Sequence, residues 1–318
     1  MVSFRCILTV AILIILPLAA IGPVSAWDLT RSVSDDFPPA IGIAGEPLVG
    51  LDVPDADPTF EDQLIELVNQ ERWSNGQLPP LKRVDLLDTA SETHSTNMAG
   101  RDFVMHCDPD TGTMPWDRML AAGYSYSSAA ENIAWGYTSP ESVIAGWMAS
   151  SGHRANILSS TFREMGNGYF EQGNDQPNVR RTTVSSSCTP NIFNEGPFFR
   201  YWTQDFGGRN AVYPLVIARE AYLTESRDVD LYLYGSGWAD DMRLRNETGA
   251  WTDWLTFASN LPWQLSSGSG TKTVTVELRN GATVLTSSDT IILDDNGELV
   301  FSDDFESGGT SSWSVVAP

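Results

Sequence analysis

Positive charge is scarce in this chain. Its 318 residues contain 19 Lys and Arg against 41 Asp and Glu, which gives a formal net charge of −22, and only Lys82 and Lys272 are lysines. Such a surface repels nucleic acid and anionic lipid headgroups. We therefore expect no nucleic-acid partner, and we expect the charge to serve solubility or to attract cationic partners.

Long apolar runs are absent after the first 26 residues. Near the N-terminus, Arg5 precedes an apolar run from Ile7 to Ile21, and the small residues Val24-Ser25-Ala26 follow. This order predicts a secretory signal peptide over residues 1–26. The alternative is an uncleaved anchor, but the apolar stretch is short for a span of about 20 residues. We expect an exported protein, either secreted or at the periplasm or cell surface, with no stable membrane span after cleavage.

Cysteine is also rare. Cys6 lies in the predicted signal peptide, which leaves Cys107 and Cys188. An even pair in an exported chain predicts one disulfide, and closing a loop of this length stabilises a fold by about 3–4 kcal/mol. Two free thiols are the alternative. Because Cys107 follows His106 directly, the disulfide would also anchor that histidine.

The chain divides by its periodicity. Residues 27–58 are rich in Pro, Asp and Gly, which predicts a linker or an N-terminal arm. Residues 59–207 carry helical patterns followed by two strands. The expected helices cover 59–74, 84–101, 115–122 and 140–149, and the strands cover 165–170 and 198–206. Helices followed by strands predict an α+β domain with α-β-α layers.

Beyond residue 207 the helical patterns disappear. Val229, Leu231 and Leu233 alternate with polar residues, and Val274 and Val276 do so in a later segment. Short alternating strands separated by turns predict a small antiparallel sandwich over residues 211–295, which resembles immunoglobulin-like modules. Residues 296–318 are rich in Ser, Gly and Asp and predict a flexible C-terminal tail.

The residue types that are common in metal and catalytic sites concentrate in the predicted domain over residues 59–207. All three histidines, His94, His106 and His153, precede residue 207. Glu131 begins an apolar-aromatic run, ENIAW. A carboxylate in such a run is either exposed at a turn or buried with a partner, since an unpaired buried charge is costly.

Five segments in order give a more specific indication: FVMHCDP, AENIAWGY, GWMASSGHRANIL, FREMGNGYF and YWTQDFG. Together they resemble the CAP superfamily (cysteine-rich secretory proteins, antigen 5, pathogenesis-related 1 proteins), and its bacterial secreted branch in particular. The resemblance implies an α-β-α sandwich with a cleft lined by two His and two acidic residues. It places His106, Glu131 and His153 in that cleft, with Ser150 where the family has its second acid. His94 lines the same cleft or packs beneath it.

Two imidazoles and a carboxylate are a ligand set that suits zinc, with one position open for water. His106, His153 and Glu131 would form that set, although Ser150 in the acidic position weakens it. The alternative is a hydrogen-bonded cluster without metal. A serine nucleophile beside His153 is a further alternative, but sequence neighbours rarely meet triad geometry, and no GxSxG motif is present.

These observations favour a non-enzymatic extracellular binding protein over an enzyme. Its ligand would be a cell-envelope component, a small apolar molecule or an extracellular protein. The second hypothesis is a metal-dependent, protease-like hydrolase that uses the same cleft. The third is a structural surface protein.

Overall fold

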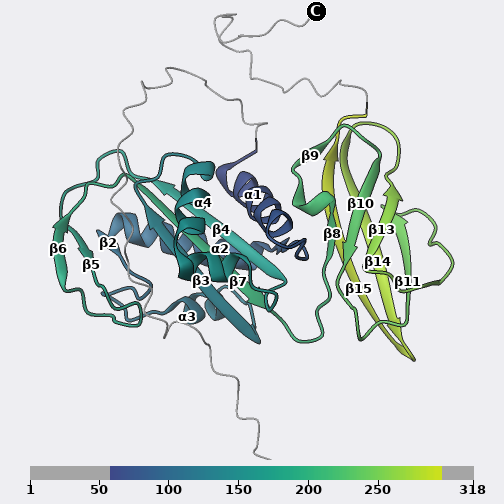
Figure 1. Ribbon diagram of the computed structural model, residues 1–318, viewed down its shortest axis with the longest axis horizontal. Helices are drawn as coiled ribbons and strands as arrows, with labels where there is room; N and C mark the ends of the chain where they lie inside the picture. The colour runs from purple at the N-terminus through teal and green to yellow at the C-terminus, as the bar shows by residue number, and fades with distance from the viewer. Residues whose placement is uncertain (1–57, 296–318) are drawn as a thin grey trace, which may run out of the picture.

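The computed structural model describes residues 58–295 (Figure 1). The predicted signal peptide, nearly all of the predicted linker and the predicted C-terminal tail lie outside this range. For description we call residues 58–208 the N-terminal unit and residues 209–295 the C-terminal unit. The domain boundaries inferred from the sequence remain predictions.

A four-stranded sheet forms the centre of the N-terminal unit, in the order β1-β4-β7-β3. The pair β1–β4 is parallel, and the other two pairs are antiparallel. The strands are β1 (Lys82–Arg83), β3 (Ser128–Trp135), β4 (Glu164–Glu171) and β7 (Arg200–Gly208).

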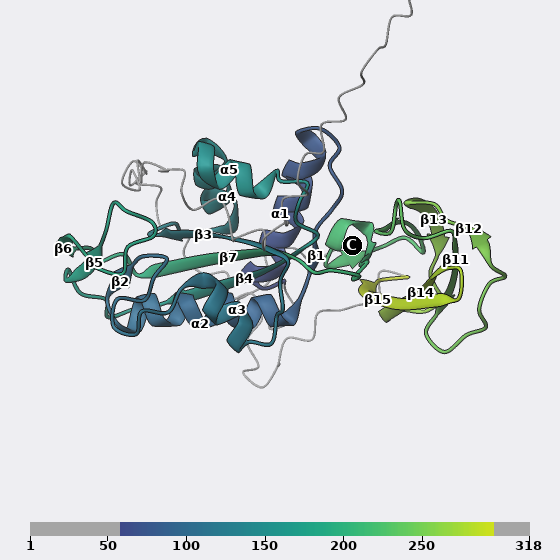
Figure 2. The same cartoon turned by 90° about the horizontal axis from the view of Figure 1, so that it is seen from below.

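Helices cover both faces of this sheet, which gives the α-β-α layering expected from the sequence. Figure 2 shows α1, α4 and α5 on one side and α2 and α3 on the other. The helices are α1 (Phe60–Ser74), α2 (Asp85–Gly100), α3 (Pro115–Ala121), α4 (Pro140–Ala149) and α5 (Ser151–Ile157). Trp202 on β7 belongs to the core under α1 and α4, and Tyr201 belongs to the core on the α2 side.

Local sequence signals explain where most of these helices begin. Thr59 and Asp62 form a capping box at the start of α1, in which each side chain accepts from the other residue's backbone N–H. Pro115 and Pro140 occupy first-turn positions in α3 and α4, where a missing N–H costs nothing. Val143 and Trp147 lie on one face of α4, and both are buried.

The segment that contains His153 differs from the sequence-based expectation. The serines and glycine of SSGH are typical of a turn, but residues 151–157 form α5. Ser150 lies between the two helices, as the C-terminal cap of α4 and the N-terminal cap of α5, with an extended backbone. The chain therefore kinks at Ser150 and resumes as a helix, because only one residue leaves helical geometry.

The N-terminal unit also contains a small second sheet, with the strand order β2-β5-β6. Its strands are β2 (Phe103–Val104), β5 (Val179–Arg181) and β6 (Ile192–Glu195). Cys107, just after β2, and Cys188, between β5 and β6, form the predicted disulfide. This cross-link fixes the segment that carries His106.

Two sheets make up the C-terminal unit, in the orders β13-β10-β8 and β12-β11-β14-β15-β9. Their strands are β8 (Leu215–Ile217), β9 (Leu223–Thr224), β10 (Asp228–Leu233), β11 (Asp241–Asn246), β12 (Leu255–Thr256), β13 (Asn260–Gln264), β14 (Gly270–Asn280) and β15 (Thr283–Leu293). A short 3₁₀ turn, η1 (Ala218–Glu220), follows β8.

One apolar core joins these two sheets. It takes alternate residues from both, including Leu231 of β10 and Val276 of β14. The alternation is the one expected from the sequence, because successive side chains of a strand point to opposite faces. Its immunoglobulin-like character remains a prediction. Of the helices in residues 58–295, none has the length and apolar character needed to cross a membrane.

Candidate functional site

The predicted residues His106 and Glu131 meet directly. His106 follows β2, and Glu131 lies on β3 with its side chain fully buried. His106 Nδ1 lies 2.7 Å from Glu131 Oε1. An ionised carboxylate only accepts hydrogen bonds, so Nδ1 carries the proton of this contact. The His106 side chain keeps 11% of its surface exposed.

Arg118, a residue that the sequence analysis did not single out, completes this contact. It lies on α3, is 5% exposed, and donates from Nη2 to Glu131 Oε2 at 2.6 Å. The same guanidinium donates to the backbone carbonyl of His106 at 3.1 Å from both terminal nitrogens. Arg118 therefore fixes both the carboxylate and the backbone of the histidine that the carboxylate contacts.

These contacts set the ionisation of Glu131. Burial acts to raise the pKa of Glu131, but Arg118, His94 and His106 outweigh burial and hold that pKa at about 2. Glu131 is therefore an anion at neutral pH, and the nearby guanidinium compensates its charge. A carboxylate with so low a pKa is a weak general base.

Asp205 lies beside Glu131 on the neighbouring strand and was also missed. The two residues are paired in the β3–β7 register. Burial, and then the charge of Glu131, raise the pKa of Asp205 well above its ordinary value. Ser91 donates to Asp205 Oδ2 at 3.0 Å. Both effects disfavour the charged form of Asp205, so Glu131 is the member of this pair that ionises more readily.

His94 packs beneath the pair. It is fully buried on α2, with Nε2 2.9 Å from the Met105 carbonyl and 3.9 Å from Glu131 Oε1. Burial, then Arg118, lower the pKa of His94 to about 3. The ring is therefore neutral and donates from Nε2 to a carbonyl, which supports the packing alternative for this residue. We call His94, His106, Arg118, Glu131 and Asp205 the His106 site.

His153 forms a second contact, with Ser150. His153 Nδ1 lies 2.8 Å from Ser150 Oγ. Burial, then His106, lower the pKa of His153 to about 3. The His153 carbonyl accepts from Asn132 on β3 at 3.3 Å, which ties α5 to the sheet.

Ser150 and His153 are in contact, but the contact does not have the geometry of a catalytic triad. The contact uses Nδ1, the ring nitrogen that a catalytic triad gives to its orienting acid, whereas the nucleophile faces Nε2. Ser150 is also only three residues before His153, at the cap of the same helix, so the contact is a local one. The arrangement is not that of a triad.

The side chains present do not fit the divalent metal that the resemblance allowed. Within residues 58–295, no group of three or more His, Cys, Asp or Glu side chains is arranged to hold a metal ion. Both oxygens of Glu131 already accept hydrogen bonds, from His106 and Arg118. A guanidinium on the carboxylate would repel a second cation at the same place. The set of His106, His153 and Glu131 stays a hypothesis that this arrangement does not favour.

Comparison with known proteins concerns the N-terminal unit. Residues 65–206 match the family model described as CAP, the cysteine-rich secretory protein family. The uncharacterized protein YkwD of Bacillus subtilis is 39% identical over 120 residues, which cover 38% of this chain and 46% of that protein. The uncharacterized membrane protein YlbC of the same organism is 27% identical over 126 residues, which cover 39% of this chain and 35% of that protein. The match spans less than half the length of either relative.

Solved structures also show similarity. An extracellular protein containing an SCP domain from Bacillus anthracis shares 23% identity, with a TM-score of 0.36, over 47% of this chain and 40% of that one. An outer surface protein from Borrelia burgdorferi shares 17% identity, with a TM-score of 0.36, over 47% of this chain and 93% of that one. The family model and the curated relatives support a CAP, or SCP, domain over residues 65–206 of this chain.

Proposed function

We propose that this chain is an exported CAP-domain protein that acts as a non-enzymatic extracellular binding protein, with the surface around His106 and His153 facing its ligand. One observation carries this proposal: Glu131 is held on both oxygens, by His106 at 2.7 Å and by Arg118 at 2.6 Å. Both oxygens of the carboxylate that a metal or an acid–base mechanism would use are thus already hydrogen-bonded to other side chains of the protein.

The neighbouring groups support the same reading. His94 is neutral and bonded to a backbone carbonyl, and Asp205 is a buried acid without access to solvent. General acid–base catalysis needs a group that changes protonation during the reaction. These side chains instead form a hydrogen-bonded frame that orients the partly exposed ring of His106. A fixed polar group at a surface is suited to recognition.

The charge of the chain narrows the ligand class. A net charge of −22 disfavours polyanionic ligands. We therefore propose an uncharged or cationic cell-envelope component as the ligand, ahead of a small apolar molecule or an extracellular protein. The runner-up function is a metal-dependent hydrolase at the same residues, and a structural surface protein is the third.

Cosedimentation with purified peptidoglycan tests the proposal. We expect the parent chain to sediment with it, and His106→Ala and His153→Ala to lose most of the binding. Glu225→Gln, an exposed change in the C-terminal unit, serves as the control and should bind as the parent does. Binding that survives both histidine variants would contradict the proposed surface. Zinc-dependent cleavage of peptidoglycan that requires His106 and His153 would favour the hydrolase.

A further inference from the structure

A strained turn lies where the two units meet. Ala218, Arg219 and Glu220 all have positive φ, at 43°, 60° and 65°, and none of them is glycine. This left-handed conformation brings Cβ too close to the backbone, so L-residues rarely adopt it in succession. Strain of this kind persists only where the surroundings hold the backbone in place.

The surroundings that hold this turn belong to the N-terminal unit. The Arg219 carbonyl accepts from Asn69 Nδ2 on α1 at 2.9 Å. Asn69 is fully buried and also bonds the backbone of Leu81 in both directions, at 2.7 and 3.0 Å. The Arg219 guanidinium lies over the ring of Trp73, 3.6 Å from its centroid. Both the backbone and a side chain of the turn are thus fixed to α1.

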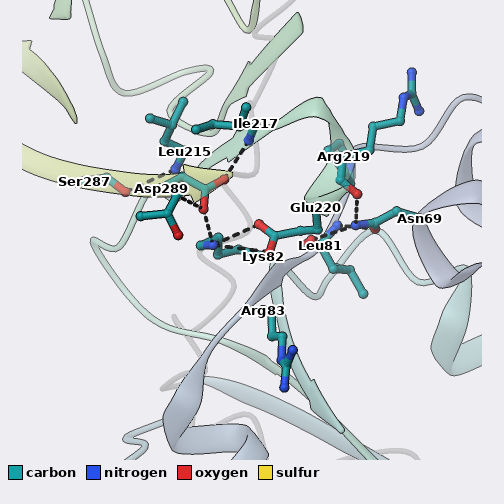
Figure 3. A network of polar contacts seen from close by, with 12 residues as sticks. Asn69, Leu81, Lys82, Arg83, Leu215, Ile217, Arg219, Glu220, Ser287 and Asp289 are labelled. Carbon is teal, nitrogen blue, oxygen red and sulfur yellow. Dashed lines mark hydrogen bonds and ion pairs between the residues drawn. The ribbon is translucent and has the colours of Figure 1, made fainter. Parts of the chain in front are cut away.

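Lys82 makes the central ionic contact (Figure 3). From β1 of the N-terminal unit, its ammonium bonds Glu220 at 2.9 Å and Asp289 at 2.5 Å, both in the C-terminal unit. The two carboxylates are nearly buried, at 9% and 1% exposure. Asp289 also accepts from the Ile217 backbone N–H at 2.6 Å, just before the turn. One of the chain's two lysines therefore bonds two buried acidic side chains across the junction.

Further contacts cross the same junction. Tyr234 Oη donates to the Pro80 carbonyl at 3.0 Å, and Arg163 donates to the Val212 carbonyl at 3.0 Å. The Tyr222 backbone N–H donates to Glu66 of α1. Several backbone and side-chain groups on each side are therefore satisfied by the other unit. Groups left unpaired by separation of the units would have to find water instead.

We propose that the turn 218–220 and Lys82 form a lock that holds the two units as one rigid body. The C-terminal unit is then a fixed platform beside the CAP domain and not a mobile spacer. The backbone strain is the cost of placing Glu220 against Lys82 and the Arg219 carbonyl against Asn69. Removing Lys82 takes the bonded cation away from the buried acidic pair of Glu220 and Asp289, which opens the lock.

The groups around Glu220 give the lock a pH dependence. Burial, then Asp289, raise the pKa of Glu220 to about 8 against the opposing effect of Lys82. An adjoining cavity of about 470 Å³ is lined from both units, and the charged residues on its wall besides Lys82, Glu220 and Asp289 are Asp62, Arg83, Asp85 and Asp88. Glu66 approaches from α1. A raised carboxyl pKa means that the folded state binds more protons between pH 4.5 and 8, so the lock weakens as pH rises through that window.

Small-angle X-ray scattering on the full chain tests the lock. At pH 6 we expect the parent to scatter as one compact body, and Lys82→Met to show a larger radius of gyration as the units separate. Lys82→Arg should stay compact. Lys272→Met is the matched control, because the other lysine donates to the Ser267 carbonyl within the C-terminal unit. A Lys82→Met profile equal to that of the parent, or independent motion of the units in the parent, would overturn the proposal.

A second variant decides the case in which Lys82→Met unfolds altogether. The triple variant Lys82→Met, Glu220→Gln, Asp289→Asn removes the stranded charges together with the lysine. If the uncompensated carboxylates caused the failure, this variant folds and scatters as a compact body. If it unfolds as Lys82→Met does, the ionic contact is not what holds the junction, and the lock is wrong.

Discussion

Replacing Arg118 by methionine removes the cation that compensates Glu131. The methionine fills similar space, but the carboxylate loses its guanidinium partner and has no exposed side-chain surface. Breaking a buried ion pair from one side costs about 3–5 kcal/mol, because a charge is left uncompensated. For a domain of this size the midpoint of thermal unfolding would fall by about 6–20 °C.

Urea unfolding of matched variants measures this cost. Arg200→Met is the control, since its partner Glu171 is half exposed and such surface pairs are worth at most about 1 kcal/mol. The double variant Arg118→Met, Glu131→Gln should recover much of the loss, because the stranded charge is gone. A cost for Arg118→Met below about 1 kcal/mol, similar to that of Arg200→Met, would refute the view that Arg118 holds the site together.

Two other perturbations test the surroundings of the site. His94 and His153 have folded-state pKa values of about 3 against 6.5 for the free group, so the unfolded state binds more protons between these values. Their stabilisation is complete above pH 6.5 and is lost as pH falls, by roughly 2 kcal/mol for each histidine at pH 5. His153→Gln should flatten the fall measured by urea unfolding, and a parent stability that is constant from pH 7.5 to 5 would contradict the assignment. Replacing Cys107 and Cys188 together by serine opens a loop with a sequence separation of 81 residues. We expect a loss of about 4 kcal/mol in the same assay, and a loss near zero would show that the loop is ordered without the bond.

The sequence predicts those elements whose boundaries depend on neighbouring residues. The capping box of Thr59 and Asp62 and the proline at the start of α4 act within one turn, so their effect is visible in the sequence. The kink at Ser150 is different. Two serines and Gly152 are typical of a turn, and the contacts of α5 with β3 that favour a helix come from residues far away in the sequence.

The turn at 218–220 is beyond sequence reasoning for a related reason. Left-handed backbone is usually marked by glycine, and the sequence there is Ala-Arg-Glu. The contacts that hold it, with Asn69 and Lys82, come from a distant part of the chain, and nothing in the local pattern indicates them.

The site was predicted in part. The resemblance brought His106 and Glu131 together, and the structure places them in contact. Arg118 was missed because a charged residue on a short helix is typical of an exposed position. Asp205 carried a usable signal, since it shares a strand face with Tyr201 and Thr203, which face α2. A polar residue on a buried face needs a partner, and Ser91 and Glu131 are the candidates that this reasoning could have found.

The central claim is that Arg118, and not a metal ion, compensates Glu131 in the His106 site. Thermal unfolding of the chain at pH 7.5, with and without zinc, tests it most directly. A ligand that binds only the folded state adds about 2.7 kcal/mol at a hundredfold excess over its Kd. We predict an unchanged midpoint. A rise that disappears in His106→Ala and in His153→Ala, but persists in His94→Ala, would contradict the account and place a metal at these residues.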